Sequence, residues 1–304
     1  MSRVTAARIV ADWGTSNLRV FALGEASNLL AEASSDTGMG KLTPDGYEPA
    51  LLELIGDWLD ANRVTPVIVC GMAGARQGWT EAAYRCVPCT PVGRPFARPR
   101  VASPLIEVFI VPGLSQAEPA DVMRGEETQI AGVLAASPGF AGVVCLPGTH
   151  SKWALVKDGR VERFATFMTG ELFALLATQS VLRHGMASEG SDEAAFDAGV
   201  ADAISQPAGL AAELFRLRAA GLLADLPAAA ARSRLSGLLV GAELAAARPF
   251  WQENEVLVVG SGALTELYRR ALAGLGAQAR AISGEKMVLL GLVQAFERIS
   301  AETA

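Results

Sequence analysis

Two segments about half a chain apart follow the same pattern, and this repeat constrains the fold more than any other feature of the sequence. "IVADWGTSNLRVFAL" at 9–23 and "VVCLPGTHSKWALV" at 143–156 each read as an apolar strand, a Gly-Thr turn and a second strand. The turn at Gly14–Thr15 corresponds to that at Gly148–Thr149. The repeat predicts an α/β protein with two related lobes, each opening with a β-hairpin.

The remaining apolar patterns supply further strands and helices for both lobes. Asp158–Gly159 is a good turn for a further hairpin within 152–167. We place the boundary between the lobes within 115–140 and take them as 1–130 and 131–304. Strands are predicted at 65–71, 105–113, 142–148, 152–167 and 255–262, and helices at 49–62, 125–136, 170–185, 232–247, 263–276 and 285–299.

Composition excludes several classes of protein. The chain has 304 residues, 51% of them hydrophobic, and a net charge of -6, so it can bury large cores and offers no basic surface for nucleic acid. No apolar run is long enough to span a membrane, and the N-terminus lacks the apolar region of a signal peptide. We expect a cytoplasmic protein with reduced thiols, because the single CxxC at Cys86–Cys89 lacks the further ligands of a zinc site.

The small residues of the two turns are suited to an anion. Glycine lets backbone N–H groups approach a phosphate closely, and the neighbouring hydroxyls add donors. A carboxylate beside a phosphate is repulsive unless a divalent cation lies between them, so Asp12 is the candidate Mg²⁺ ligand. A third glycine site, Gly260-Ser261-Gly262, follows a strand and opens a helix, where free N–H groups and the helix dipole also favour an anion.

The motifs together resemble the 2-dehydro-3-deoxygalactonokinase family, within the superfamily of acetate and sugar kinases, heat-shock ATPases and actin. That resemblance implies two ribonuclease-H-like lobes with a nucleotide cleft between them, the actin-like ATPase fold. The matching blocks occur in the expected order along nearly the whole chain. They are "DWGTSNLR" at 12–19, "GMAGARQGW" at 71–79, "DVMRGEETQ" at 121–129, "LPGTHSKW" at 146–153, "FMTGELFALL" at 167–176 and "GSG" at 260–262.

The resemblance implies an ATP-dependent carbohydrate kinase of galactonate catabolism that transfers the γ-phosphoryl group to the 6-hydroxyl of 2-dehydro-3-deoxy-D-galactonate with Mg²⁺. Many superfamily members have an acid before the second turn, where this chain has Leu146–Pro147, so Asp12 is left as the metal ligand. Phosphate contacts are expected from Gly14, Thr15 and Ser16, and from Gly148, Thr149 and His150; adenosine contacts are expected from Gly260, Ser261 and Gly262.

Transfer to an alcohol usually needs a carboxylate that accepts the proton. Asp121 is the candidate base, since it precedes "RGEETQIAGVL" and looks like the aspartate that sugar kinases of this superfamily present at a helix entrance. Glu126 and Glu127 are alternatives on the same turn. A sugar acid also needs a guanidinium for its carboxylate. The substrate-site candidates are Arg76, Gln77 and Trp79 on one glycine-rich loop, and Arg124 near the proposed base.

Three other functions stay open at this stage. The chain could phosphorylate another keto-deoxy sugar acid, act as a regulatory actin-like ATPase without a metabolite substrate, or bind a phosphate compound without ATP. The stereochemistry of the acid depends on one or two side chains that spacing does not identify. A homodimer is also open, because apolar faces such as "LSGLLVGAEL" suit a core or an interface equally well.

Overall fold

The computed structural model describes residues 4–300, which divide into two compact units. The first unit contains the described residues up to Phe140, the segment Val156–Arg163 and the residues from Gly284 onward. The second unit contains Ala141–Leu155 and Phe164–Ser283. The chain therefore returns to the first unit at its end, which the predicted division into 1–130 and 131–304 did not include.

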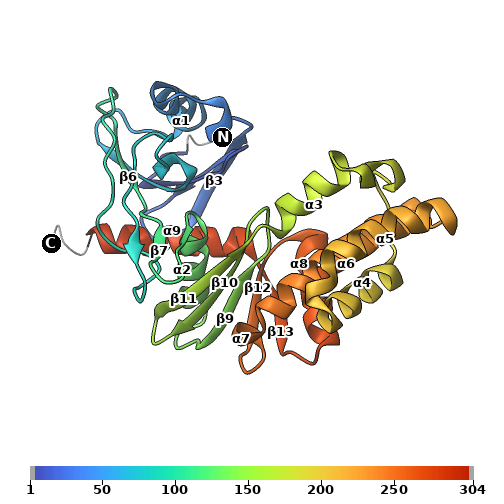
Figure 1. Ribbon diagram of the computed structural model, residues 1–304. Coiled ribbons are helices and arrows are strands. Elements are labelled where there is room, and N and C mark those ends of the chain that lie inside the picture. Colours follow the sequence, from blue (N-terminus) through green and yellow to red (C-terminus); the bar gives the residue numbers. More distant parts are fainter. Residues whose placement is uncertain (1–3, 301–304) are drawn as a thin grey trace. The chain divides into compact units, whose positions relative to one another are not determined.

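Both units are built on a five-stranded sheet with the same strand order. In the first sheet the order is β3-β2-β1-β4-β6. In the second sheet the order is β11-β10-β9-β12-β13 (Figure 1). The central strand of each is parallel to the strand that follows it in this order. This arrangement confirms the predicted pair of ribonuclease-H-like lobes. The strands are β1 (Arg8–Trp13), β2 (Leu18–Leu23), β3 (Leu29–Ser35), β4 (Thr65–Gly71), β6 (Ile106–Ile110), β9 (Gly142–Leu146), β10 (Ser151–Lys157), β11 (Arg160–Phe167), β12 (Val256–Gly260) and β13 (Ala279–Ser283).

The predicted hairpins form where the turn residues require them. β1 and β2 are antiparallel with Asp12 opposite Arg19, and the backbone N–H of Gly14 donates to the carbonyl of Asn17 at 2.9 Å. β10 and β11 are joined by Asp158–Gly159 with φ of 50° and 73°. Positive φ at both turn positions is the mark of a type I′ turn, whose twist matches that of the strands.

The first sheet is covered on both faces because alternate residues of its strands point to opposite sides. Ile9, Ala11 and Trp13 of β1 share a core cluster with helix α1 (Tyr47–Ile55). Val10, between them, belongs to the cluster formed with helices α2 (Glu126–Ala136) and α9 (Gly284–Ser300). Short 3-10 turns complete this layer at Met39–Lys41, Pro44–Gly46, Gly56–Trp58 and Met72–Gly74.

Helices α2 and α9 lie side by side although they are far apart in the sequence (Figure 1). Glycines permit this close approach. A Cβ on Gly132 of α2 would lie 1.9 Å from the carbonyl oxygen of Met287, and a Cβ on Gly291 of α9 would lie 1.8 Å from that of Thr128. No side chain fits at either position while the helices keep this separation.

We expect Gly291→Ala to lower the free energy of unfolding by about 1–3 kcal/mol, the range for overpacking a close-packed contact. Gly221→Ala is the matched control, because a Cβ there meets nothing within 4 Å and alanine favours a helix by about 1 kcal/mol over glycine. Urea unfolding of both variants checks this. Equal unfolding midpoints for the two variants would contradict the proposed close contact.

In the second unit, helices pack on one face of the sheet. Trp153 of β10 and Val258 of β12 share a cluster with residues from several of these helices. The segment "LSGLLVGAEL" lies in α6 and is largely buried within the unit, so it is core. The helices are α3 (Thr169–Thr178), α4 (Glu193–Ser205), α5 (Leu210–Leu223), α6 (Ala228–Ala246), α7 (Arg248–Trp251) and α8 (Gly262–Gly274), with 3-10 turns at Val181–Gly185 and Pro207–Gly209.

Within residues 4–300, none of the helices combines the length and the apolar character that crossing a membrane requires.

Candidate active site

The first Gly-Thr turn presents backbone donors to solvent. Thr15 and Ser16 are exposed, and neither backbone N–H donates to a protein acceptor in the described part of the chain. The carbonyl groups of this turn are occupied instead. The N–H groups of Gly38 and Gly40 donate to the carbonyls of Ser16 and Thr15 at 3.2 and 2.9 Å. The glycine-rich loop after β3 therefore fixes the turn and leaves its donors available to an anion.

Asp12 lies at the end of β1 beside a cation and a thiol. Its Oδ2 accepts from Nη2 of Arg19 at 2.6 Å, and its Oδ1 accepts a weak hydrogen bond from Sγ of Cys70 at 3.7 Å. The side chain of Asp12 is 21% exposed. Burial lowers the pKa of the guanidinium, but the hydrogen bond and charge of Asp12 outweigh that effect and raise the pKa of Arg19. The guanidinium of Arg19 therefore keeps its positive charge at this edge of the sheet.

The N-terminus of α2 lies next to the end of β4. A Cβ on Gly125 would be 3.4 Å from Cα of Gly71, the last residue of β4, which pairs with Trp13 of β1. Glu126, the first residue of the helix, is half-buried and accepts from the backbone N–H of Arg124 at 3.0 Å. The helix start therefore brings a partly accessible carboxylate to the edge of the sheet that carries Asp12.

Glu127 is fully buried at the same helix start. Its Oε2 accepts from the N–H of Gly125 at 2.6 Å, and the hydroxyl of Thr128 donates to Oε1 at 3.2 Å. Burial, reinforced by the charge of Glu126, raises the pKa of Glu127 to about 8. This carboxyl group does not reach solvent, so it is less suited than Glu126 to contact a substrate.

The buried Glu127 makes stability depend on pH. The folded state keeps the proton up to about pH 8, whereas the unfolded chain loses it near 4.5. Between these values the unfolding free energy contributed by Glu127 falls as pH rises, by about 1.4 kcal/mol per unit at most. We expect Glu127→Gln to remove this slope in urea unfolding at pH 5.5, 7 and 8.5. Glu126→Gln should keep most of it; a wild-type slope in Glu127→Gln would contradict the assignment.

Asp121 lies elsewhere than the sequence predicts. It is the first residue of β8 (Asp121–Met123), paired with Gln116 of β7 (Leu114–Gln116), in a small sheet with β5 (Arg85–Cys86). The predicted position at a helix entrance is wrong, because α2 begins only at Glu126. Asp121 therefore stands beside the β7–β8 turn, at the end of the hairpin away from α2. The role of Asp121 as the base stays a prediction, and its distance from the start of α2 along the hairpin argues against that role.

The glycine-rich loop after β4 divides its residues between solvent and core. Arg76 and Gln77 are exposed, and Arg76 pairs with Glu81 at 3.5 Å. Trp79 is only 8% exposed and stacks on Tyr47 with ring centroids 5.9 Å apart, beside Trp13. The expectation that Trp79 forms a wall of the substrate site is therefore corrected, because its ring is used in the core.

Arg124 holds this loop in place. Its Nη2 donates to the carbonyl of Ala82 at 2.8 Å, and its guanidinium lies 4.4 Å from the ring centroid of Tyr84. Its Nη1 also packs against Gly74, where an added Cβ would lie 2.8 Å away. Nε and Nη1 are buried without a hydrogen-bond partner in the described part of the protein. These contacts give Arg124 a structural role between β8, α2 and the loop.

The second Gly-Thr turn is closed by the start of α3. The carbonyl of Thr149 accepts from the N–H of Glu171 at 3.0 Å, and a Cβ on Gly170 would lie 2.3 Å from the carbonyl oxygen of Gly148. His150 is exposed and pairs through Nε2 with Oε2 of Glu171 at 2.5 Å. The turn and the helix start form one rigid corner, as the first turn does with its loop.

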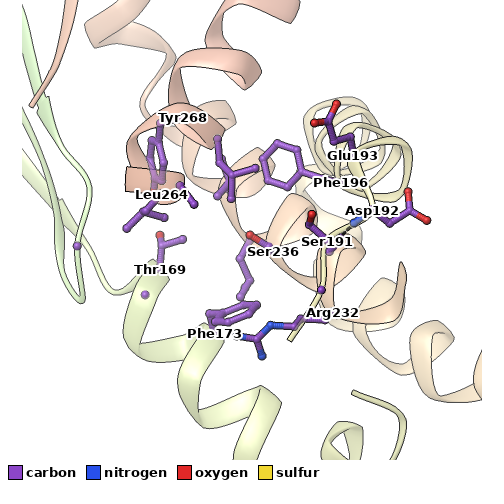
Figure 2. A pocket seen from close by; sticks show the side chains of 18 of the residues that line it. Thr169, Phe173, Ser191, Asp192, Glu193, Phe196, Arg232, Ser236, Leu264 and Tyr268 are labelled. Carbon is purple, nitrogen blue, oxygen red and sulfur yellow. Dashed lines mark hydrogen bonds between the residues drawn. The ribbon is translucent and has the colours of Figure 1, made fainter. Parts of the chain in front are cut away.

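A pocket of about 470 Å³ opens beside this corner within the second unit. Figure 2 shows Thr169 and Phe173 of α3 on one side, Leu264 and Tyr268 of α8 on another, and Phe196 of α4 and Arg232 of α6 completing the lining. The guanidinium of Arg232 lies 4.8 Å from the ring centroid of Phe173. Apolar walls with hydroxyl, carboxylate and guanidinium groups at the rim are typical of a small-molecule site. Its lining also includes Gly148, Thr149, Gly170, Gly190, Ser191, Asp192, Glu193, Ser233, Ser236, Leu239, Val240, Ala263 and Leu267.

The third glycine site stands at the start of α8. Ser261 is the N-cap residue, and Gly262, with φ of 67°, is the first residue of the helix. Gly260 to Gly262 do not line the pocket themselves, but Ala263 and Leu264, which follow them, do. The adenosine role of the three residues stays a prediction, and the structure brings the helix that they open to the pocket.

Two polar residues at these sites were missed by sequence reasoning. Arg19 could have been found, because an acid and a base seven residues apart, on either side of a tight turn, face each other across the two strands of a hairpin. Glu243 of α6, which accepts hydrogen bonds beneath the pocket, gave no such signal, since its nearest neighbours in the helix are small or apolar.

Comparison with known proteins identifies the family. The family model described as 2-keto-3-deoxy-galactonokinase matches residues 12–295. A Rhizobium meliloti (strain 1021) protein described as a 2-dehydro-3-deoxygalactonokinase is 42% identical over 298 residues, covering 95% of this chain and 96% of its own. The 2-dehydro-3-deoxygalactonokinase of Escherichia coli (strain K12) is 33% identical over 294 residues, covering 95% and 97%.

A solved structure is also similar over almost the full length. The crystal structure of a protein described as a 2-dehydro-3-deoxygalactonokinase from Sinorhizobium meliloti has a TM-score of 0.87 and 39% identity, covering 96% of each chain. The matched region includes both Gly-Thr turns, the start of α2 and the pocket of the second unit. The chain therefore belongs to the 2-keto-3-deoxy-galactonokinase family of carbohydrate kinases.

Proposed function

We propose that the protein transfers the γ-phosphoryl group of ATP to the 6-hydroxyl of 2-dehydro-3-deoxy-D-galactonate. Family membership over residues 12–295 is the observation that carries this proposal. The two Gly-Thr turns and the pocket of the second unit support it. The turns offer donors suited to the phosphates of a nucleotide, and the pocket offers apolar surface suited to its nucleobase.

In the second unit, the pocket is the proposed nucleoside site. Phe173, Leu264 and Tyr268 offer apolar surface to a base, and Ser191 and Ser236 offer hydroxyl groups for its edges or for the ribose. Gly148 and Thr149 line the same pocket, so phosphates attached to the nucleoside would lie near the second turn. His150 extends the predicted phosphate contacts from that turn.

In the first unit, the donors of Thr15 and Ser16 are the proposed second set of phosphate contacts. Arg19 adds a fixed positive charge beside Asp12. Within residues 4–300, no three His, Cys, Asp or Glu side chains gather into a metal cage. The single carboxylate of Asp12 still fits Mg²⁺, because in kinases this ion is held by one or two carboxylates, water and the phosphates themselves. Asp12 would hold the ion, which supplies neutralisation of the phosphate charge when it is bound.

We assign the base to Glu126 in preference to Asp121 and Glu127. Glu126 is partly accessible, stands at the first position of α2, and lies on the side of the sheet where β1 and β4 end. Glu127 is fully buried and Asp121 lies beside the β7–β8 turn. The carboxylate of Glu126 would take the proton of the attacking hydroxyl as the new oxygen–phosphorus bond forms.

The carboxylate of the sugar acid is assigned to the loop after β4. The side chain of Arg76 is 81% exposed, and among residues 4–300 it pairs only with Glu81 at 3.5 Å, so its guanidinium can turn to a ligand. Gln77 beside it can donate to a hydroxyl. Arg124 instead fixes the loop through Ala82 and Tyr84. A bidentate pair between Arg76 and the acid would also select against neutral sugars.

The direct test is an ADP-release assay with Mg²⁺ and ATP against both keto-deoxy epimers, gluconate, galactonate and a neutral hexose. We expect turnover with the galactonate-derived keto-deoxy acid and little ATP hydrolysis without it. Turnover with a different acid would keep the kinase and change its substrate. High ATP hydrolysis that no acid increases would favour the regulatory ATPase, and the absence of any nucleotide binding would favour the relative that works without ATP.

A cytoplasmic location and a homodimer stay predictions.

A further inference from the structure

A buried carboxyl group lies beneath the pocket of the second unit. Glu243 of α6 is 3% exposed. Its Oε1 accepts from the indole N–H of Trp153 at 2.7 Å, and its Oε2 accepts from the hydroxyl of Tyr268 at 2.7 Å and from that of Thr169. The Tyr268 hydroxyl lies 2.9 Å from Oγ of Ser151. One carboxyl group therefore joins four secondary-structure elements.

The donors to Glu243 come from the elements that form the proposed nucleotide site. Thr169 is the first residue of α3, and the next residue, Gly170, packs against the second Gly-Thr turn. Ser151 and Trp153 are in β10, which follows that turn directly. Tyr268 is in α8, the helix opened by the predicted adenosine motif, and its side chain lines the pocket with that of Thr169 (Figure 2).

A carboxyl group buried at this place, taken by itself, lowers the stability of the folded protein. Burial raises its pKa, and the hydrogen bonds of the surrounding polar side chains only partly oppose that effect. Replacing buried ionic groups with apolar side chains of similar size often leaves the stability unchanged or increases it, so such groups often contribute little net stability. What they do contribute is directional: each hydrogen bond specifies the position of its donor. A role in orienting the site is therefore the better explanation for Glu243.

We propose that Glu243 is a positioning residue for the nucleotide, fixing the second Gly-Thr turn and the first turns of α8 in the relative placement that binds ATP. This inference rests on the proposed function, since it requires the pocket to take the nucleotide. The residue contacts Thr169 and Tyr268 rather than the ligand. Its loss should therefore weaken nucleotide binding and leave sugar-acid binding nearly unchanged.

The test compares Glu243→Leu with Glu243→Gln in the full chain. Leucine removes every acceptor, so we expect the Kd for ADP, measured by calorimetry with Mg²⁺, and the KM for ATP to rise about tenfold or more, since hydrogen bonds to a carboxylate are the strong class. The KM for the sugar acid should change less than about twofold by the same reasoning. Glutamine should restore most of the affinity, because its carbonyl can accept from Trp153 and its amide can donate to hydroxyls that reverse their roles.

Leu235→Ala is the matched control, because Leu235 is a fully buried residue of α6 outside the pocket lining. It should lower the melting temperature without changing the Kd for ADP. If Glu243→Leu does not fold, Tyr268→Phe decides, since it removes one hydroxyl and keeps the ring; it should raise the same Kd about threefold or more. An unchanged Kd in the folded variants overturns the inference. A wild-type protein that binds no ADP overturns the proposed function instead.

Discussion

Glu126→Gln should lower kcat by a factor of about 100 to 10,000, the usual contribution of a general base. The amide keeps the size of the side chain and can still accept from the backbone N–H of Arg124 through its carbonyl, so the helix start should stay intact. It cannot accept the proton of the attacking hydroxyl. Steady-state kinetics with the sugar acid and ATP, with the melting temperature as a check of folding, measure the effect.

Asp121→Asn is the comparison for that experiment. Because Asp121 stands at the turn of the β7–β8 hairpin, its variant should retain kcat within about threefold, as surface substitutions outside a site usually do. The reverse result, with loss of turnover in Asp121→Asn and normal turnover in Glu126→Gln, would return the role of base to Asp121. Rates that stay normal in both variants would leave neither carboxylate as the base.

Asp12→Asn should lower kcat/KM for ATP by about a hundredfold, because charge stabilisation of the transferring phosphoryl group is the main catalytic term in such kinases. The neutral amide binds Mg²⁺ poorly and no longer forms a charged pair with Arg19. We also expect half-maximal activity to need a higher Mg²⁺ concentration. Titration of Mg²⁺ at fixed ATP measures both changes.

Arg19→Met separates the two roles that Asp12 could have. If Asp12 serves only to orient Arg19, to which it is bound at 2.6 Å, both variants should lose activity with an unchanged Mg²⁺ requirement. If Asp12 holds the ion, only Asp12→Asn should shift that requirement. Equal Mg²⁺ curves for wild type and Asp12→Asn would remove the metal assignment.

The repeat of strand, Gly-Thr turn and strand was enough to predict the two sheets, because the alternation of apolar residues and the turn chemistry act locally. The edge strands β3 and β13 were not predicted, since their residues are mostly half-buried or exposed and lack a clear apolar alternation. Helices α4 and α5 were also missed. Helix α4 is made largely of alanine with few large side chains. Helix α5 has several leucines but buries only Leu217, so neither helix shows the clear apolar period on which such a prediction depends.

In the site, the features that depend on local sequence could be predicted, and those that depend on tertiary packing could not. The exposed donors at Thr15 and Ser16 follow from the composition of the turn itself. The fate of Trp79 does not, because a tryptophan in a glycine-rich loop can face a ligand or the core, and only the positions of Trp13 and Tyr47 decide between them. From sequence Asp121 was preferred to Glu126 and Glu127, although the start of α2 was predicted to within one residue. The short strand that holds Asp121 in a small sheet gave no clear apolar pattern.

The return of α9 to the first unit has a consequence for biosynthesis. Val288 and Leu292 belong to the same core as Val10 and Ile68 of the first sheet. A ribosome therefore releases the residues of the second unit before it releases the helix that completes the first. The part of the protein that is translated first is thus the last to close its core, and until then its sheet must rely on chaperones or on its own partial structure to avoid aggregation. A chain that stops before Gly284 would therefore lack the helix that completes the core of the N-terminal unit.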